Sequence, residues 1–172
     1  MLHLYFGMGK GKTSSSIGLG IRAAGRNLRV LMVQFLKCEE SGELLFLENS
    51  ENFTIRRFES KHSFIINPTD SQTELLKKEI SVAIEFAKNE INAKNCDVLI
   101  LDEVLDVVDL GFLDESELIS LANIGNNHNV ELAFTGRNAS DKLIELADYV
   151  TDLRLVKHPY EKGITAREGI EY

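Results

Sequence analysis

The sequence predicts an α/β protein with a mostly parallel β-sheet and helices on both faces of the sheet. Short apolar runs typical of strands alternate along the chain with longer segments of helical period, which is the order of β-α-β units. The runs at 29–36 and 96–104 are apolar almost throughout, as expected for strands buried on both faces. The 172 residues suffice for one hydrophobic core and contain no internal repeat or linker. We therefore expect residues 1–172 to form a single domain.

The individual elements follow from the local pattern of the sequence. Strands are predicted at 2–6, 29–36, 53–58, 96–104, 129–136 and 149–156. Helices are predicted at 12–25, 42–48, 71–91, 114–123 and 139–147. The tail from 157 to 172 has no clear period. These elements give a sheet of parallel strands joined by crossover helices.

The longest predicted helix has a clear start and a clear buried face. Ser71 is the expected N-cap, and Glu74 three residues later completes a capping box. One face of this helix is apolar at a period of 3.6 residues, through Leu76, Ile80, Ala83, Ile84, Ala87 and Ile91. We expect this face to cover the sheet.

Composition excludes several classes of partner. With 19 Lys and Arg against 27 Asp and Glu, the net charge is −8 and the pI is about 5.1, which argues against a nucleic-acid partner. Cys38 and Cys96 are isolated thiols in no Cys-x-x-Cys pattern, as expected in a reducing compartment. Neither a signal peptide nor a run long enough to cross a bilayer is present. We expect a cytoplasmic protein with no membrane partner.

The stretch "FGMGKGKTSSS" at 6–16 is the strongest functional signal. It follows the first strand and opens a helix, where backbone amides and the helix dipole favour an anion such as a phosphate. Three residues separate Gly7 from the Gly11-Lys12 pair, one fewer than in the usual phosphate loop. The bland alternative is a glycine-rich turn with solvated lysines. The predicted nucleotide-binding residues here are Gly7, Met8, Gly9, Lys10, Gly11, Lys12, Thr13 and Ser14.

A second signal is "LILDEV", an apolar strand that ends in Asp102 and Glu103. Carboxylates at the carboxyl end of a strand lie at the sheet edge where ligands bind, and there they can hold Mg²⁺ or Mn²⁺ beside phosphates. Together with the Thr13 hydroxyl they form the predicted metal site; the alternative is an acidic strand end that caps a loop. Asp106 and Asp109 are expected to belong to a solvated loop.

Further candidates lie at the ends of two other strands. Arg137 in "FTGRNAS" follows a predicted strand, so its guanidinium is expected near the nucleotide, although a surface arginine is often merely solvated. Gln34 and Lys37 occupy a similar place at the end of the second predicted strand. All three would lie at the carboxyl edge of the sheet.

Three stretches together resemble the P-loop type of ATP:corrinoid adenosyltransferases, whose substrates are cob(I)alamin or cob(I)yrinic acid a,c-diamide. They are "GMGKGKTSSSIGLGIRAAGRNLRVLMVQFLK", "LILDE" and "TGRNASDKLIELADYVTDLRLVKHPYEKGITAREGIEY". The similarity extends over the whole chain, 1–172, and is weakest between about 39 and 95. It implies a RecA-like P-loop fold and the transfer of the 5′-deoxyadenosyl group of ATP to a Co(I) corrinoid.

The resemblance also implies how the reaction proceeds. The shortened loop holds ATP in an orientation reversed from that in ordinary P-loop enzymes, and the whole triphosphate leaves. Lys10 and Lys12 position it, Glu103 takes the metal-associated carboxylate, and no general base is needed. The implied partners are a corrinoid substrate, a reduced flavoprotein that delivers the electron, and a second copy in a homodimer.

One aromatic position is assigned through the same resemblance. Many members of the family carry a Phe-x-Trp stretch whose aromatic rings displace the lower ligand of cobalt, whereas this sequence has no tryptophan. Phe64 in "KHSFIINP" is the candidate for part of that role. Two other functions remain open at this point: an ordinary P-loop kinase or ATPase, and a regulator that binds nucleotide or corrinoid without catalysis.

Overall fold

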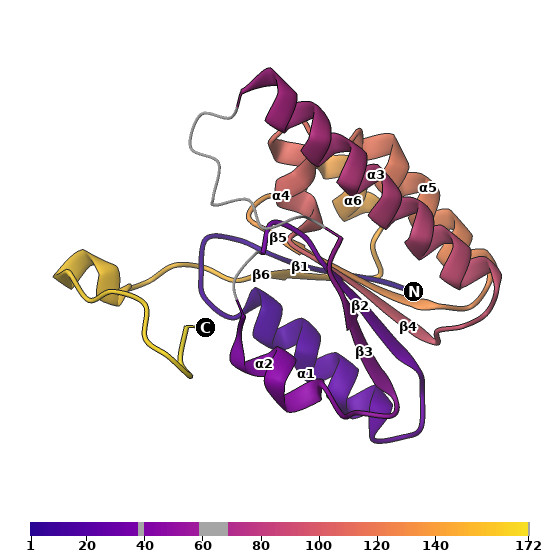
Figure 1. Cartoon of the computed structure of the whole chain (residues 1–172), viewed down its shortest axis with the longest axis horizontal. Helices are drawn as coiled ribbons and strands as arrows, with labels where there is room; N and C mark the ends of the chain where they lie inside the picture. The colour runs from indigo at the N-terminus through magenta and orange to yellow at the C-terminus, as the bar shows by residue number, and fades with distance from the viewer. Residues whose placement is uncertain (38–39, 59–68, 172) are drawn as a thin grey trace.

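The computed structural model describes residues 1–37, 40–58 and 69–171. Within them, six parallel strands form one sheet in the order β3-β2-β4-β5-β1-β6 (Figure 1). The strands are β1 (Leu2–Phe6), β2 (Val30–Gln34), β3 (Phe53–Arg56), β4 (Val98–Asp102), β5 (Glu131–Gly136) and β6 (Tyr149–Asp152). The α/β class and the parallel sheet are therefore confirmed.

Helices cover both faces of this sheet, as predicted (Figure 1). On one face lie α1 (Lys12–Ala24) and α2 (Gly42–Leu47); on the other lie α3 (Asp70–Asn92), α4 (Val104–Asp109), α5 (Glu115–Asn127) and α6 (Asp141–Leu146). Side chains along β2 alternate between two cores: Leu31 and Val33 pack with the α3 and α5 side, and Val30 and Met32 with the α1 side. Both faces are thus apolar, which explains why β2 is buried at all five positions.

The start of α3 differs from the prediction. Thr69 is the N-cap, Gln72 completes the capping box, and Ser71 lies inside the helix. Both Thr69–Gln72 and Ser71–Glu74 fit the capping-box pattern, and the earlier pair adds two helical residues and places Asp70 in the first turn, where the helix dipole favours an acid. The six apolar residues predicted for the inner face of α3 are all buried.

The segment after β4 is a helix rather than the expected loop. In α4, Val104, Leu105 and Val107 are buried, and this packing stabilises one and a half turns directly after Glu103. Asp106 is therefore half-buried on a helix instead of lying in a solvated loop, whereas Asp109 is exposed. The loop was expected because of the acidic residues, although the apolar residues between them have a helical period.

The carboxyl-terminal part leaves the body of the molecule after β6. This strand ends at Asp152, four residues earlier than predicted, and the chain then extends away to a 3₁₀ helix at Pro159–Lys162, labelled η1 below, before turning back (Figure 1). In the described part of the chain, none of the helices has both the length and the apolar character needed to span a membrane.

Candidate active site

The glycine loop lies at the carboxyl end of β1 and leads into α1, as predicted. Gly7 and Gly11 have φ values of 115° and 116°, which glycine adopts without strain. Two backbone hydrogen bonds tie the loop to its neighbours: the Gly7 amide donates to the Arg137 carbonyl at 3.0 Å, and the Gly9 amide to the Leu153 carbonyl at 2.6 Å. The loop is therefore held between the ends of β5 and β6.

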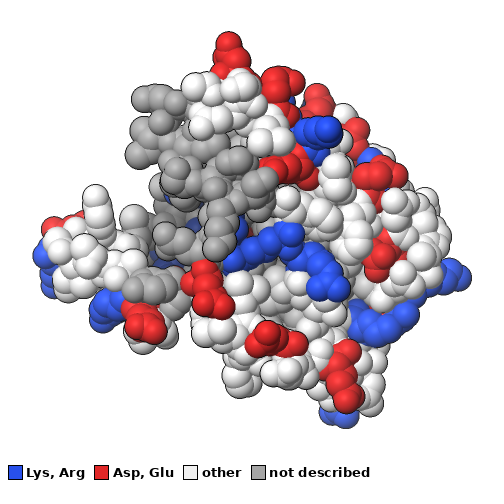
Figure 2. Space-filling model, in the orientation of Figure 1, with Lys and Arg blue, Asp and Glu red and all other residues white. Residues whose placement is uncertain are grey.

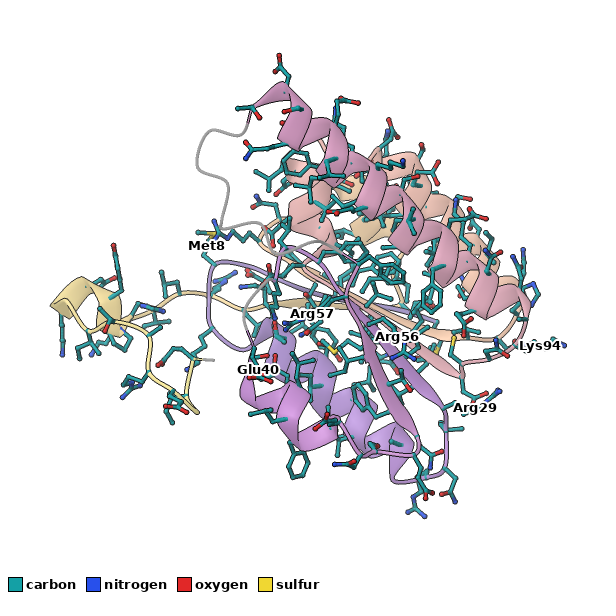
Figure 3. The ribbon with its side chains drawn as sticks, in the orientation of Figure 1. Met8, Arg29, Glu40, Arg56, Arg57 and Lys94 are labelled. Carbon is teal, nitrogen blue, oxygen red and sulfur yellow. The ribbon has the colours of Figure 1, made fainter. Side chains whose placement is uncertain are left out.

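The requirement for glycine is strict where the loop crosses the end of β6. A Cβ atom at Gly9 would lie 2.6 Å from the Leu153 carbonyl oxygen and 2.8 Å from that of Arg154. Both obstacles are backbone atoms and cannot rotate away. Met8, between Gly7 and Gly9, has no such constraint: its side chain is exposed and points away from the loop (Figure 3).

Lys12 lies on the inner side of the loop. Its Nζ donates to the carbonyl oxygens of Gly7 at 2.8 Å and Gly9 at 2.9 Å, so the backbone curves around the ammonium. Burial lowers the pKa of Lys12, and the negative charge of Asp106 is the main opposing influence. The ammonium is thus placed where the loop can present it to an anion.

Lys10 lies on the outer side of the same loop and has a different partner. Its Nζ donates to the Ile170 carbonyl and to Glu171 Oε1, both at 2.9 Å. The Arg167 guanidinium, with help from Lys10, holds the pKa of Glu171 at about 2. The tail of the chain therefore returns to the rim of the loop and supplies an anion there.

Asp102 connects the loop to the end of β4. Although β5 lies between β1 and β4, the Thr13 hydroxyl at the start of α1 reaches Asp102 Oδ1 at 3.0 Å. Asp102 is fully buried and also accepts from Thr135 Oγ1 at 2.8 Å and from Lys37 Nζ at 2.6 Å. The structure thus brings together the hydroxyl and the carboxylate predicted for the metal site.

Glu103 has an unusual backbone conformation beside that carboxylate. Its φ of 64° is in the left-handed region, and its amide donates to Thr135 Oγ1 at 2.8 Å. Burial raises the pKa of the Glu103 carboxyl to about 7, while the nearby Lys37 ammonium opposes the shift. Left-handed non-glycine residues cost conformational energy and persist where the surroundings enforce them, frequently at functional sites.

The donor set suits a hard divalent cation that is also bound by phosphates. In the described part of the chain, no cluster of three or more His, Cys, Asp and Glu side chains could hold a metal ion alone. Asp102, Glu103 and the Thr13 hydroxyl offer oxygen atoms, and Mg²⁺ typically binds through one or two carboxylates and the phosphates of its nucleotide. The residues therefore fit Mg²⁺ that binds most tightly together with the phosphates of a nucleotide.

Arg137 lies at the same edge, but its side chain is exposed. Its backbone carbonyl holds Gly7, its amide donates to Asp106 Oδ1 at 3.2 Å, and its Nε lies 3.9 Å from that oxygen. Asp106 thus orients the β5 end of the site. The sequence did not indicate this role, because the segment that contains Asp106 was expected to be a solvated loop. Ser14, in the first turn of α1, is exposed.

A basic group extends the site along β2 and β3. Gln34 is buried and donates to Asp102 Oδ2 at 3.3 Å, while Arg57 donates to Gln34 Oε1 through Nε at 3.0 Å and Nη2 at 2.8 Å. Basic side chains gather over the middle of the face viewed in Figure 2, where Figure 3 places Arg56 and Arg57. Arg57 belongs to no sequence motif, and only the pairing of β2 with β3 places it at the site. Phe64 lies outside the described residues.

These observations define a class of protein before any comparison is made. The sheet is parallel, a glycine-lysine loop follows β1, and a buried carboxylate ends β4, which β5 separates from β1. This is the arrangement of a P-loop nucleotide-binding protein. The carboxylate lies within hydrogen-bond reach of the first hydroxyl of the loop helix, as a nucleotide-bound metal requires.

Comparison with known proteins narrows the class to one family. Residues 1–172 match the family described as ATP:corrinoid adenosyltransferase BtuR/CobO/CobP, and the chain belongs to this family. It is therefore a transferase that uses ATP to adenosylate a corrinoid in cobalamin biosynthesis. This assignment favours the transferase over the kinase or ATPase and the non-catalytic regulator.

Similar curated proteins agree with the family. The corrinoid adenosyltransferase of Pseudomonas aeruginosa is 32% identical over 100% of this chain and 83% of its own length. Those of Sinorhizobium sp and Escherichia coli K12 are each 29% identical, over 96% and 98% of this chain and 77% and 84% of their own lengths. A crystal structure of a DNA replication initiation factor superposes with a TM-score of 0.46 at 17% identity, over 90% of this chain and 40% of that one, a likeness too weak to support any inference.

Proposed function

We propose that residues 1–172 act as one adenosyltransferase domain in which the short loop binds the triphosphate of ATP as a leaving group. A Co(I) corrinoid attacks the 5′-carbon of the ribose, a Co–C bond forms, and the C5′–O5′ bond breaks. The electron pair of that bond leaves with the triphosphate. The observation that carries the proposal is the pairing of the Lys12 loop with Thr13 and Asp102 at one sheet edge.

The charges of the site support a leaving triphosphate. Lys12 lies inside the loop, Lys37 lies beside Asp102, and the loop amides at the start of α1 add the positive end of a helix dipole. Donors held in place before the reaction stabilise charge as it develops on the leaving oxygen. A site for phosphoryl transfer must instead leave the γ-phosphorus open to an in-line nucleophile.

Mg²⁺ or Mn²⁺ is proposed to be held by Asp102, Glu103 and the Thr13 hydroxyl. When bound, the ion supplies positive charge to the triphosphate as it leaves. The chain orients those ligands through Thr135, whose hydroxyl donates to Asp102 and accepts from the Glu103 amide. Because the cobalt nucleophile carries no proton, the contribution of the protein is mainly the positioning of the two substrates.

The finer assignments of partners are also proposals. Phe64 is proposed to contact the corrinoid, and a reduced flavoprotein is proposed to deliver the electron. The reaction is proposed to take place in the cytoplasm, which the free thiol of the buried Cys96 supports. A homodimer is proposed as well, supported by the exposed edge strand β6 and the exposed apolar side chains of Val156 and Tyr160 in the tail. Analytical ultracentrifugation over a range of protein concentrations tests the dimer.

An anaerobic assay tests the reaction directly. The protein is mixed with ATP, Mg²⁺ and chemically reduced cob(I)alamin, the corrinoid spectrum is followed, and the phosphate product is identified. A light-sensitive adenosylated corrinoid formed together with triphosphate is the expected result. Production of ADP with an unchanged corrinoid spectrum would return the protein to the kinases and ATPases; tight binding of both ligands without product would indicate a regulator.

A further inference from the structure

Lys37 lies at the centre of the proposed metal site. Its Nζ is 2.6 Å from Asp102 Oδ2, 3.3 Å from Thr13 Oγ1 and 3.8 Å from Glu103 Oε1. These are the three groups whose oxygen atoms suit the divalent cation. An ammonium of this chain therefore occupies the place between them.

The reason for this ammonium is the burial of Asp102. Its side chain is completely inaccessible, and a buried carboxylate is costly unless a positive charge and hydrogen bonds accompany it. Thr13, Thr135 and Gln34 provide the hydrogen bonds, and Lys37 provides the charge. Lys37 thus does for Asp102 what a metal ion would otherwise do.

The backbone before Lys37 directs its side chain toward this place. Leu36 has a φ of 56°, in the left-handed region that branched and bulky residues rarely adopt, so the chain turns sharply just after β2. The Lys37 side chain remains 22% exposed, and its four-carbon stem has several rotatable bonds. The ammonium is therefore placed by the backbone without being locked in the interior.

We propose that Lys37 is an exchangeable counter-ion: it neutralises Asp102 before the nucleotide binds, gives up this position to the divalent cation, and then pairs with the triphosphate. This inference rests on the proposed function. A divalent cation and an ammonium on the same carboxylate oxygen atoms repel one another, so both cannot keep the position. The Lys37 ammonium is already 3.3 Å from the hydroxyl of Thr13, which lies in the first turn of α1 directly after the loop, and a triphosphate is the strongest anion expected there.

Exchange and a fixed structural ion pair predict opposite results for metal binding. If Lys37 competes with the cation, removal of its charge strengthens binding of the metal alone. If Lys37 only holds the site together, its removal weakens metal binding or leaves it unchanged. For ATP the exchange model predicts the reverse sign, because the triphosphate loses a cation.

The test measures Mn²⁺ binding to the full chain by electron paramagnetic resonance, without ATP or corrinoid. Lys37→Met removes the charge and keeps most of the stem, and Lys77→Met on α3 makes the same change in net charge far from the site. Lys37→Met is expected to bind Mn²⁺ about 10-fold more tightly than the wild type, an effect of the size that removal of a neighbouring like charge produces. Lys77→Met is expected to match the wild type.

The affinity for ATP in the presence of Mg²⁺ is then measured by calorimetry. Lys37→Met is expected to bind ATP about 10-fold more weakly, since a charge-assisted contact is lost. If Lys37→Met does not fold, Lys37→Gln is used, because its amide can still donate to Asp102 and the same two changes are expected. An unchanged or weaker affinity for Mn²⁺ in a folded variant overturns the exchange, and an unchanged affinity for ATP overturns the contact with the triphosphate.

Neither measurement depends on turnover, so the inference and the proposed function can fail separately. A wild-type protein that produces no adenosylated corrinoid, while Lys37→Met shows both shifts, would contradict the proposed reaction and leave the exchange intact. Normal adenosylation by the wild type without the rise in Mn²⁺ affinity would do the opposite.

Discussion

The inner side of the phosphate loop and its outer rim carry one lysine each, and the structure uses them differently. On the inner side, Lys12 donates to two carbonyl oxygens of the loop itself, next to Thr13 and the buried Asp102. On the rim, Lys10 donates to Glu171 and the Ile170 carbonyl, which come from the end of the chain. Two lysines separated by one glycine therefore belong to two different parts of the molecule.

This difference shows that sequence proximity does not define a shared binding role. The contacts of the inner lysine are local, within five residues of it, whereas those of the rim lysine span about 160 residues. The inner contacts are partly buried and therefore less screened, whereas the rim contacts are exposed and screened by solvent. Variants on the two sides are expected to differ in both size and direction of effect.

The largest effect is expected for Lys12→Ala. Removal of the inner ammonium takes charge from the leaving triphosphate in a partly enclosed site, so kcat/KM for ATP should fall about 100-fold or more. Steady-state adenosylation measures it, with circular dichroism as a control for folding. Full activity of a folded Lys12→Ala variant would show that the loop does not hold the triphosphate.

A large effect on stability is also expected for Gly9→Ala. Gly9 lies between the inner side and the rim. The added Cβ would meet the Leu153 carbonyl at 2.6 Å, so the loop must shift and stability should fall by about 1–3 kcal/mol. Urea denaturation measures the change. Gly18→Ala on α1 is the matched control: its Cβ meets nothing within 4 Å, and alanine in a helix should stabilise by about 1 kcal/mol.

An effect of similar size is expected for Glu103→Gln on the inner side, in the pH dependence of stability. The carboxyl has a pKa of about 7 in the folded protein against 4.5 for the unperturbed group, so the folded state holds the proton more tightly. Wild-type stability without metal should therefore fall as pH rises from about 4.5 to about 7, by up to about 3 kcal/mol relative to Glu103→Gln. Urea denaturation in chelator-treated buffer at several pH values measures the difference.

A matched variant controls for general charge effects in that experiment. Glu85→Gln removes the same charge from an exposed position of α3 and should leave the pH dependence of the wild type in place. Parallel stability curves for Glu103→Gln and the wild type would contradict the raised pKa. A higher metal requirement of Glu103→Gln in the adenosylation assay would independently support its role as a ligand.

The smallest effects are expected on the rim, and in opposite directions. Lys10→Ala should raise the KM for ATP, because a cation next to the loop is lost. Glu171→Gln should lower it, because a competing anion is removed, and each change should be at most about fivefold, since exposed ion pairs are weak. Steady-state kinetics at low and high salt measures both; identical responses of Lys10→Ala and Lys12→Ala would abolish the distinction between rim and inner side.

Several features of the site were predictable because they depend on local pattern. The loop, Thr13, Asp102 and Glu103 all follow from short motifs placed at the carboxyl ends of strands, and parallel strands bring those ends to one edge. The buried face of α3 was also predicted, since a period of 3.6 residues is a local property. The cap at Thr69 was missed because two capping boxes overlap and local pattern does not rank them.

Other features depend on neighbours that are distant in sequence. Asp106 was expected in a solvated loop, because the burial of α4 arises from packing against β5 and not from its acidic spacing. Arg57 joins the site because β3 pairs with β2. The Leu153 carbonyl accepts from the Gly9 amide because β6 pairs with β1. No local pattern specifies such contacts.

The sequence by itself determined the α/β class, the glycine-lysine loop, the paired acids at the end of β4 and the family, because each is encoded by the spacing of residues within a short stretch. Only the tertiary structure decided which charges meet: Lys12 within its own loop, Lys10 with the chain end, and Lys37 with the buried Asp102. The physical reason is that a cation lowers the free energy most beside the carboxylate or carbonyl whose burial would otherwise be most costly. That choice depends on burial, which the folded chain alone establishes.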